Sequence, residues 1–159
     1  MKRVEILAPM TGRVVPIDEV PDPVFAERMI GDGVAIEPTG SVGVAPISGT
    51  LVVFHSAGHA FAIEGENGVS VLVHVGLDTV NLKGRGFTRL AEAGDAVTAG
   101  QELVRFDLST IAAEHLSALS PVVLPQLDPT YRVSPTTADE VEAGRDVLLT
   151  VELPDPVPA

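Results

Sequence analysis

The chain has 159 residues, a hydrophobic fraction of 45%, no cysteine and a formal net charge of −12. This length fits one domain that can bury a sizeable core, and the lack of cysteine excludes disulfides, thiolate catalysis and cysteine-based zinc sites. The acidic balance argues against nucleic acid and anionic lipid as partners, because both require a basic surface.

Short apolar runs alternate along the chain with clusters of Gly, Pro, Asp and Asn. They predict strands over residues 4–8, 12–17, 34–37, 49–54, 60–64, 69–75, 102–106 and 147–151. Only residues 22–30 and 109–116 favour short helices. Many short strands separated by turn signals are typical of an all-β sandwich or barrel. We therefore predict one all-β domain over residues 1–153, followed by a Pro-rich tail at 154–159.

No targeting or membrane segment is predicted. The first residues lead directly into an apolar strand without a signal-peptide core, and no apolar run reaches 18 residues. We expect a cytoplasmic protein that does not insert into a membrane.

The sequence contains an internal repeat. APMTGRVV at 8–15 resembles APISGTLV at 45–52, and the tripeptide AIE follows at both 35–37 and 62–64. A second pair is EAGDAV at 92–97 and EAGRDV at 142–147. Two copies indicate a duplicated β unit packed against itself within one domain.

Two of the four histidines, His59 and His74, flank the turn sequence at residues 65–68, which favours a β-hairpin. A two-residue loop at 66–67 places His59 directly opposite His74, whereas one at 67–68 places His59 on the diagonal. Both registers put the two imidazoles on one face because side chains alternate along a strand. A loop with an odd number of residues would invalidate this argument. The expected histidine face also carries Phe61, Ile63 and Leu72, and the expected core face carries Val69, Val71, Val73, Val75, Ala60 and Ala62.

A histidine pair on an apolar face fits a phosphohistidine site, a zinc site or a general acid/base pair. His74 and Asp78 have an H-x-x-x-D spacing, but this is a weak zinc signal. His55 and His59 are four residues apart, a spacing expected to converge only on a helix, and residues 56–58 are not helical in character. No serine nucleophile elbow and no glycine-rich nucleotide motif is present.

Eight segments together resemble the glucose-type IIA family of the sugar phosphotransferase system. The match covers roughly residues 5 to 152, and its most specific part is VLVHVGLDTVNLKGRGF at 71–87. The other segments are ILAPMTG at 6–12, PDPVFAE at 21–27, GDGVAI at 31–36, VAPISGT at 44–50, HAF at 59–61, ELVRFD at 102–107 and SPVV at 120–123.

The resemblance implies a barrel-sandwich hybrid fold with a duplicated motif. It implies that His74 accepts a phosphoryl group from the phosphocarrier HPr and passes it to a cysteine on the IIB domain of a membrane sugar permease. It further implies that His59 supports transfer, that the Gly76 carbonyl orients His74, and that no cofactor is required. The docking face implied by the family comprises Asp22, Val24, Phe25, Phe61, Leu72 and Asp78.

The chain departs from the family pattern at two positions. Ala57 stands where a threonine is usual, and His55 stands at an often apolar or aromatic rim position. A zinc peptidase of a related fold is the alternative, but its H-x-H element is missing. A third hypothesis is a regulatory protein that binds permeases or kinases through the same face, where His59 and His74 could hold zinc at an interface.

Overall fold

The computed structural model describes residues 2–154 and consists of antiparallel sheets joined by short helical turns, which confirms the all-β prediction. The largest sheet has the strand order β13-β2-β3-β11-β7-β6-β5-β9. In that order its bounds are Glu140–Val141, Gly12–Pro16, Gly31–Pro38, Ser120–Pro125, Ser70–His74, Ala60–Glu64, Gly49–Phe54 and Ala96–Val97. The predicted tail begins at Pro154, and its residues 155–159 lie outside the described residues.

Two three-stranded sheets complete the architecture. The first is β1 (Lys2–Leu7), β14 (Val147–Leu153) and β12 (Arg132–Pro135), and the second is β4 (Val42–Val44), β10 (Glu102–Phe106) and β8 (Phe87–Arg89). The α-helices are α1 (Pro23–Ala26) and α2 (Leu108–Ala113), and the 3-10 helices are η1 (Ile17–Glu19), η2 (Glu66–Gly68) and η3 (Thr79–Leu82). Within residues 2–154, none of these helices has the length and apolar character needed to cross a bilayer.

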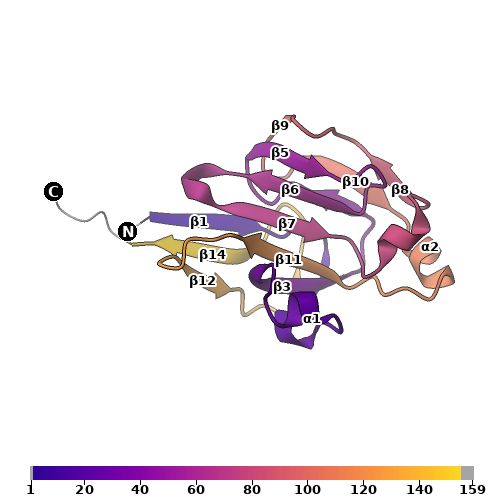
Figure 1. Ribbon diagram of the computed structural model, residues 1–159, viewed down its shortest axis with the longest axis horizontal. Helices are drawn as coiled ribbons and strands as arrows, with labels where there is room; N and C mark the ends of the chain where they lie inside the picture. The colour runs from indigo at the N-terminus through magenta and orange to yellow at the C-terminus, as the bar shows by residue number, and fades with distance from the viewer. Residues whose placement is uncertain (1, 155–159) are drawn as a thin grey trace.

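The sheets enclose one main apolar core. Figure 1 shows β5, β6, β7, β11 and β3 side by side, with α1 packed beside β3. Side chains such as Ile6, Phe61, Val71, Leu103 and Leu149 fill the core and are fully buried. Each such side chain contributes about 1.5–3 kcal/mol through removal of apolar surface from water.

A second, smaller cluster lies on the outer face of the large sheet. Phe25 of α1 and Ile17 of η1 pack there against Ala35 and Val123 of the sheet and against Leu77. This cluster is important for the site because it fixes α1 and the loop after β7 against the same surface.

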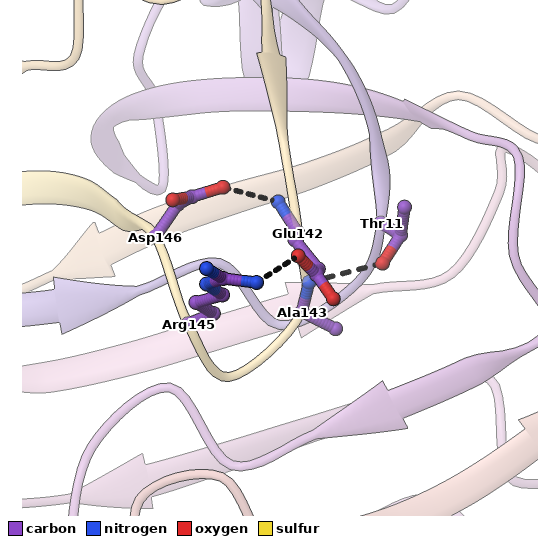
Figure 2. Close-up of polar contacts among 5 residues, drawn as sticks. All are labelled: Thr11, Glu142, Ala143, Arg145 and Asp146. Carbon is purple, nitrogen blue, oxygen red and sulfur yellow. Dashed lines mark hydrogen bonds and ion pairs between the residues drawn. The ribbon is translucent and has the colours of Figure 1, made fainter.

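The duplication is present in the fold, but one of its predicted pairs is wrong. The hydroxyl of Thr11 accepts a hydrogen bond from Ala143 N at 3.0 Å, as Figure 2 shows, and the hydroxyl of Ser48 accepts one from Ala99 N at 2.9 Å. The following glycines pair equivalently, Gly12 with Val141 and Gly49 with Val97. The structural counterpart of residues 142–145 is therefore 98–101, although segment 92–97 resembles segment 142–147 more closely in sequence.

The predicted hairpin forms, but neither predicted register is correct. Ala60 pairs with His74 and Glu64 with Ser70, so five residues separate the two strands. This odd loop contains η2, with Asn67 at a φ of +59°. As a result Phe61 and Ile63 share the core face with Val71 and Val73, while His74 shares the outer face with Ala60, Ala62 and Leu72.

Candidate functional site

His74 is the last residue of β7, and its ring has a defined tautomer. Its Nδ1 lies 2.5 Å from the carbonyl oxygen of Gly76. A carbonyl oxygen only accepts hydrogen bonds, so Nδ1 carries the proton and donates it. In the neutral ring the lone pair is then on Nε2, which is free to act as a nucleophile. This geometry agrees with the predicted orienting position of Gly76.

Gly76 is itself held in place by its neighbours. Its N–H donates to the Ser120 hydroxyl at 3.0 Å, and the Thr79 hydroxyl donates to the preceding carbonyl, that of Val75, at 2.6 Å. Gly76 has a φ of +75°, and a Cβ there would lie 2.5 Å from Thr79 Cγ2 and 2.8 Å from Ser117 O. Only glycine satisfies both the backbone angle and the space.

His59 precedes β6 and lies beside His74, with 5.2 Å between the ring centroids. His59 and His74 are therefore close together, as predicted, but not because they share one face of a hairpin. His59 lies outside the strand, where alternation no longer applies, and its carbonyl accepts from Val75 N at 2.7 Å. The side chain is only 3% exposed, and its Nδ1 is buried without a hydrogen-bond partner.

A third imidazole adjoins this pair. The His55 ring lies 4.2 Å from the His59 ring, centroid to centroid. The prediction that side chains four residues apart, such as His55 and His59, converge only on a helix is thus wrong here, because the turn after β5 folds back on itself. Gly58 N donates to His55 O at 2.8 Å, and His55 N donates to Ala60 O at 2.9 Å.

Burial favours the neutral form of both site histidines. It lowers the pKa of His59 to about 4, with smaller contributions from the neighbouring His74 and His55. Burial also lowers the pKa of His74, although the hydrogen bond to Gly76 and the charges of Asp22 and Asp78 act in the opposite direction. At pH 7 the site therefore offers two neutral rings, and a neutral imidazole is the nucleophilic form.

Helix α1 covers one side of His74. Asp22 is its N-cap and accepts from Val24 N at 3.0 Å, and Pro23 opens the first turn, where its missing N–H is not needed. Phe25 is buried against the site, with its ring centroid 5.8 Å from that of His74. Val24 is 40% exposed and presents apolar surface to solvent.

The remaining predicted docking residues divide into two groups. Leu72 lies on the outer face of β7 with His74, and Asp78 is an exposed residue at the start of η3. Phe61 is fully buried in the main core, so its predicted place on the histidine face is wrong. The odd loop is the reason, because it shifts the register by one residue and exchanges the two faces of β6.

The site contains residues that sequence reasoning did not single out. Ser120 and Thr79 support the Gly76 peptide, Phe87 lies 6.4 Å from the His59 ring, and Val80 is 47% exposed after Asp78. Thr79 lies in the segment around His74 and Ser120 begins the separate segment at 120–123, but nothing in their spacing predicts which backbone group they contact. Across residues 2–154 no group of three or more His, Cys, Asp or Glu side chains is placed to hold a metal ion.

The large antiparallel sheet carries two adjacent imidazoles, those of His59 and His74. Residues 4–129 match the family model described as phosphoenolpyruvate-dependent sugar phosphotransferase system, EIIA 1. The chain belongs to this family and is a component of a phosphotransferase system.

Individual relatives extend the match over nearly the whole chain. It is 39% identical to the PTS system glucose-specific EIIA component of Oceanobacillus iheyensis, covering 94% of this chain and 91% of that one. It is 46% identical to part of the N-acetylglucosamine-specific EIICBA component of Escherichia coli, covering 78% of this chain and 19% of the other. The solved glucose permease IIA from Mycoplasma capricolum superposes with a TM-score of 0.88 at 39% identity, covering 94% of this chain and 96% of that one.

Proposed function

We propose that the chain is a phosphocarrier that accepts a phosphoryl group on His74 Nε2 from the phosphohistidine of HPr and passes it to a cysteine of a IIB domain. The observation that carries this proposal is the hydrogen bond from His74 Nδ1 to Gly76 O, which leaves Nε2 as the free lone pair. The buried, neutral His59 beside it supplies a ring that can donate to phosphoryl oxygens.

The proposed steps balance without any further reactant. The Nε2 lone pair of His74 attacks phosphorus, the N–P bond of the donor breaks, and its electron pair stays on the donor nitrogen. In the second step a thiolate forms an S–P bond while the N–P bond on His74 breaks and returns its pair to Nε2. Such transfers depend on positioning and charge stabilisation more than on protein acid or base groups.

The surface around His74 suits docking of another protein. Val24, Leu72 and Val80 offer apolar contact, and Asp22 and Asp78 offer negative charge beside the ring. The net charge of −12 favours a partner with a basic face. The EIICBA relative carries its EIIA region in one chain with other components, which supports a IIB domain of a membrane permease as the acceptor.

We further propose that the whole of residues 1–153 acts as one cytoplasmic EIIA domain. The sugar is selected elsewhere, since relatives named for glucose and for N-acetylglucosamine share this domain. Sugar specificity is therefore assigned to the membrane component.

The test is incubation with phosphoenolpyruvate, enzyme I and HPr, followed by mass measurement at alkaline pH, where phosphohistidine persists. The wild type should gain one phosphoryl group and His74→Ala none. His115→Ala is the matched control, because it removes an exposed histidine that follows α2. Labelling of His74→Ala at the wild-type level would overturn the assignment.

A further inference from the structure

His59 is almost completely buried, and three of its neighbours are aromatic or imidazole rings. Its ring contacts His74 on one side at 5.2 Å and Phe87 on another at 6.4 Å, centroid to centroid. The shortest of these ring distances is to His55, at 4.2 Å. Its Nδ1 nevertheless has no partner, so hydrogen bonding at that atom does not fix the orientation of the ring.

His55 differs from the other two rings because it is itself exposed to solvent. It therefore lies between the buried His59 ring and water. Its own orientation is defined, because Ala57 N donates to its Nδ1 at 3.0 Å. A backbone N–H can only donate, so this Nδ1 holds a lone pair and the ring is anchored to its own turn.

The turn that carries His55 is constrained at its other end. Gly58 has a φ of +92°, and a Cβ there would meet Phe87 Cβ at 3.1 Å and Arg89 Cγ at 3.3 Å. The turn is thus packed against β8, and the hydrogen bonds between His55 and residues 58 and 60 close it. The His55 ring is held over His59 by this backbone geometry.

We propose that His55 is a positioning residue for His59, whose exposed ring packs on the solvent side of the buried imidazole, holds it beside His74 and excludes water from it. This inference rests on the proposed function, since the positioned ring serves the phosphoryl group on His74. An aromatic cover is sufficient for the role, so the nitrogen atoms of His55 do not take part.

Two substitutions at His55 separate a role of its ring as a cover from a role of its nitrogen atoms. His55→Ala removes the cover, and His55→Phe keeps a ring but removes both nitrogens. Phospho-His74 prepared with phosphoramidate, which phosphorylates histidine without any protein donor, should hydrolyse faster in His55→Ala than in the wild type. Transfer from His74 to a IIB cysteine should slow about tenfold in His55→Ala, because small misplacement of a reacting group costs one to two orders of magnitude. His55→Phe should stay within about twofold of the wild type in both assays.

A readout on the unphosphorylated protein separates failure of this inference from failure of the proposed function. The carbon-bound ring protons of His59 should show a ring-current shift in their nuclear magnetic resonance signals that His55→Ala loses and His55→Phe retains. Thermal unfolding should confirm that both variants are folded, because residue 55 is exposed. Unchanged His59 signals and unchanged hydrolysis in His55→Ala would overturn the role of His55, as would a His55→Phe variant as impaired as His55→Ala. Absence of HPr-dependent labelling in the wild type would instead refute the phosphocarrier function.

Discussion

His74 and His59 lie 5.2 Å apart, yet they are held by different forces. His74 is fixed by a chain of hydrogen bonds, from its own Nδ1 to Gly76 and from Gly76 N to Ser120. His59 has an unpartnered Nδ1 and is fixed by packing against other rings. Hydrogen bonds define a tautomer and a direction, whereas packing defines only a location. The proposed nucleophile thus has directional support from hydrogen bonds, and the proposed supporting residue His59 does not.

The strongest test of this contrast is Gly76→Ala. A side chain at this φ of +75° would collide with Thr79 and Ser117 O, so the peptide that orients His74 has to move. We expect a loss of about 3 kcal/mol or more in unfolding free energy. Phosphorylation of His74 should fall by about 100-fold.

Gly68→Ala is the matched control for Gly76→Ala. Gly68 has a similar φ of +73°, but nothing lies within 4 Å of an added Cβ. It should cost only about 1–2 kcal/mol through the backbone angle and leave phosphorylation unchanged. Denaturant unfolding and initial labelling rates measure both effects, and equal behaviour of the two variants would remove the special role of Gly76.

The pH dependence of stability tests the packed histidine. The folded-state pKa of His59 is about 4, below its ordinary value of 6.5, so between these values the unfolded chain binds the proton more readily. Stability should therefore be fully present above pH 6.5 and fall as the pH drops toward 4, by a total on the order of 3 kcal/mol. The lowered pKa of His74 acts in the same direction.

Urea unfolding of the wild type and of His59→Gln at several pH values measures this loss. The variant should show a shallower decline over the same range, because glutamine does not titrate. Parallel curves for the two proteins would mean that the His59 ring is not protected from protonation by burial.

His59→Gln also tests whether His59 supports phosphoryl transfer from His74. Glutamine keeps a hydrogen-bond donor but cannot reproduce the ring packed against His55 and His74. Acceptance from HPr should change little, since the donor supplies its own site. Transfer to the IIB cysteine should slow by about 100-fold, the scale of losing one electrostatic stabiliser. Single-turnover transfer from the phosphorylated protein is the measurement, and equal rates would reduce His59 to a bystander.

Ser120→Ala should have the smallest effect. It leaves the buried N–H of Gly76 without its acceptor, at a cost of about 1–3 kcal/mol, and loosens the carbonyl that orients His74. Ser117→Ala is the control, because Ser117 is exposed and its hydroxyl accepts from Leu119 N near the surface, so its loss should stay within about 0.5 kcal/mol. Thermal unfolding of the two variants checks the difference, and the hydrogen-bond support of His74 is unimportant if they melt together.

Much of the fold was predictable from local patterns. The strands at 49–54, 60–64 and 102–106 have the predicted bounds, because apolar residues there end at clear turn signals. Strand β11 (Ser120–Pro125) was missed, although it lies between β3 and β7 in the large sheet. It contains Pro121 and Pro125, and proline argues against a central strand when only the local sequence is considered. Short strands such as β9 and β13 are too brief to leave a pattern.

The sequence by itself pointed to His74 as the nucleophile that we propose and to a second histidine near it, because the motif around His74 is specific to the family. Only the tertiary structure decided how the rings face each other. The hairpin register depends on whether the loop has an odd or even number of residues, and in the structure the loop has five, with Asn67 in the αL conformation. The burial of His59, the cover by His55 and the support from Ser120 all arise where segments distant in sequence meet, and local patterning cannot encode such contacts.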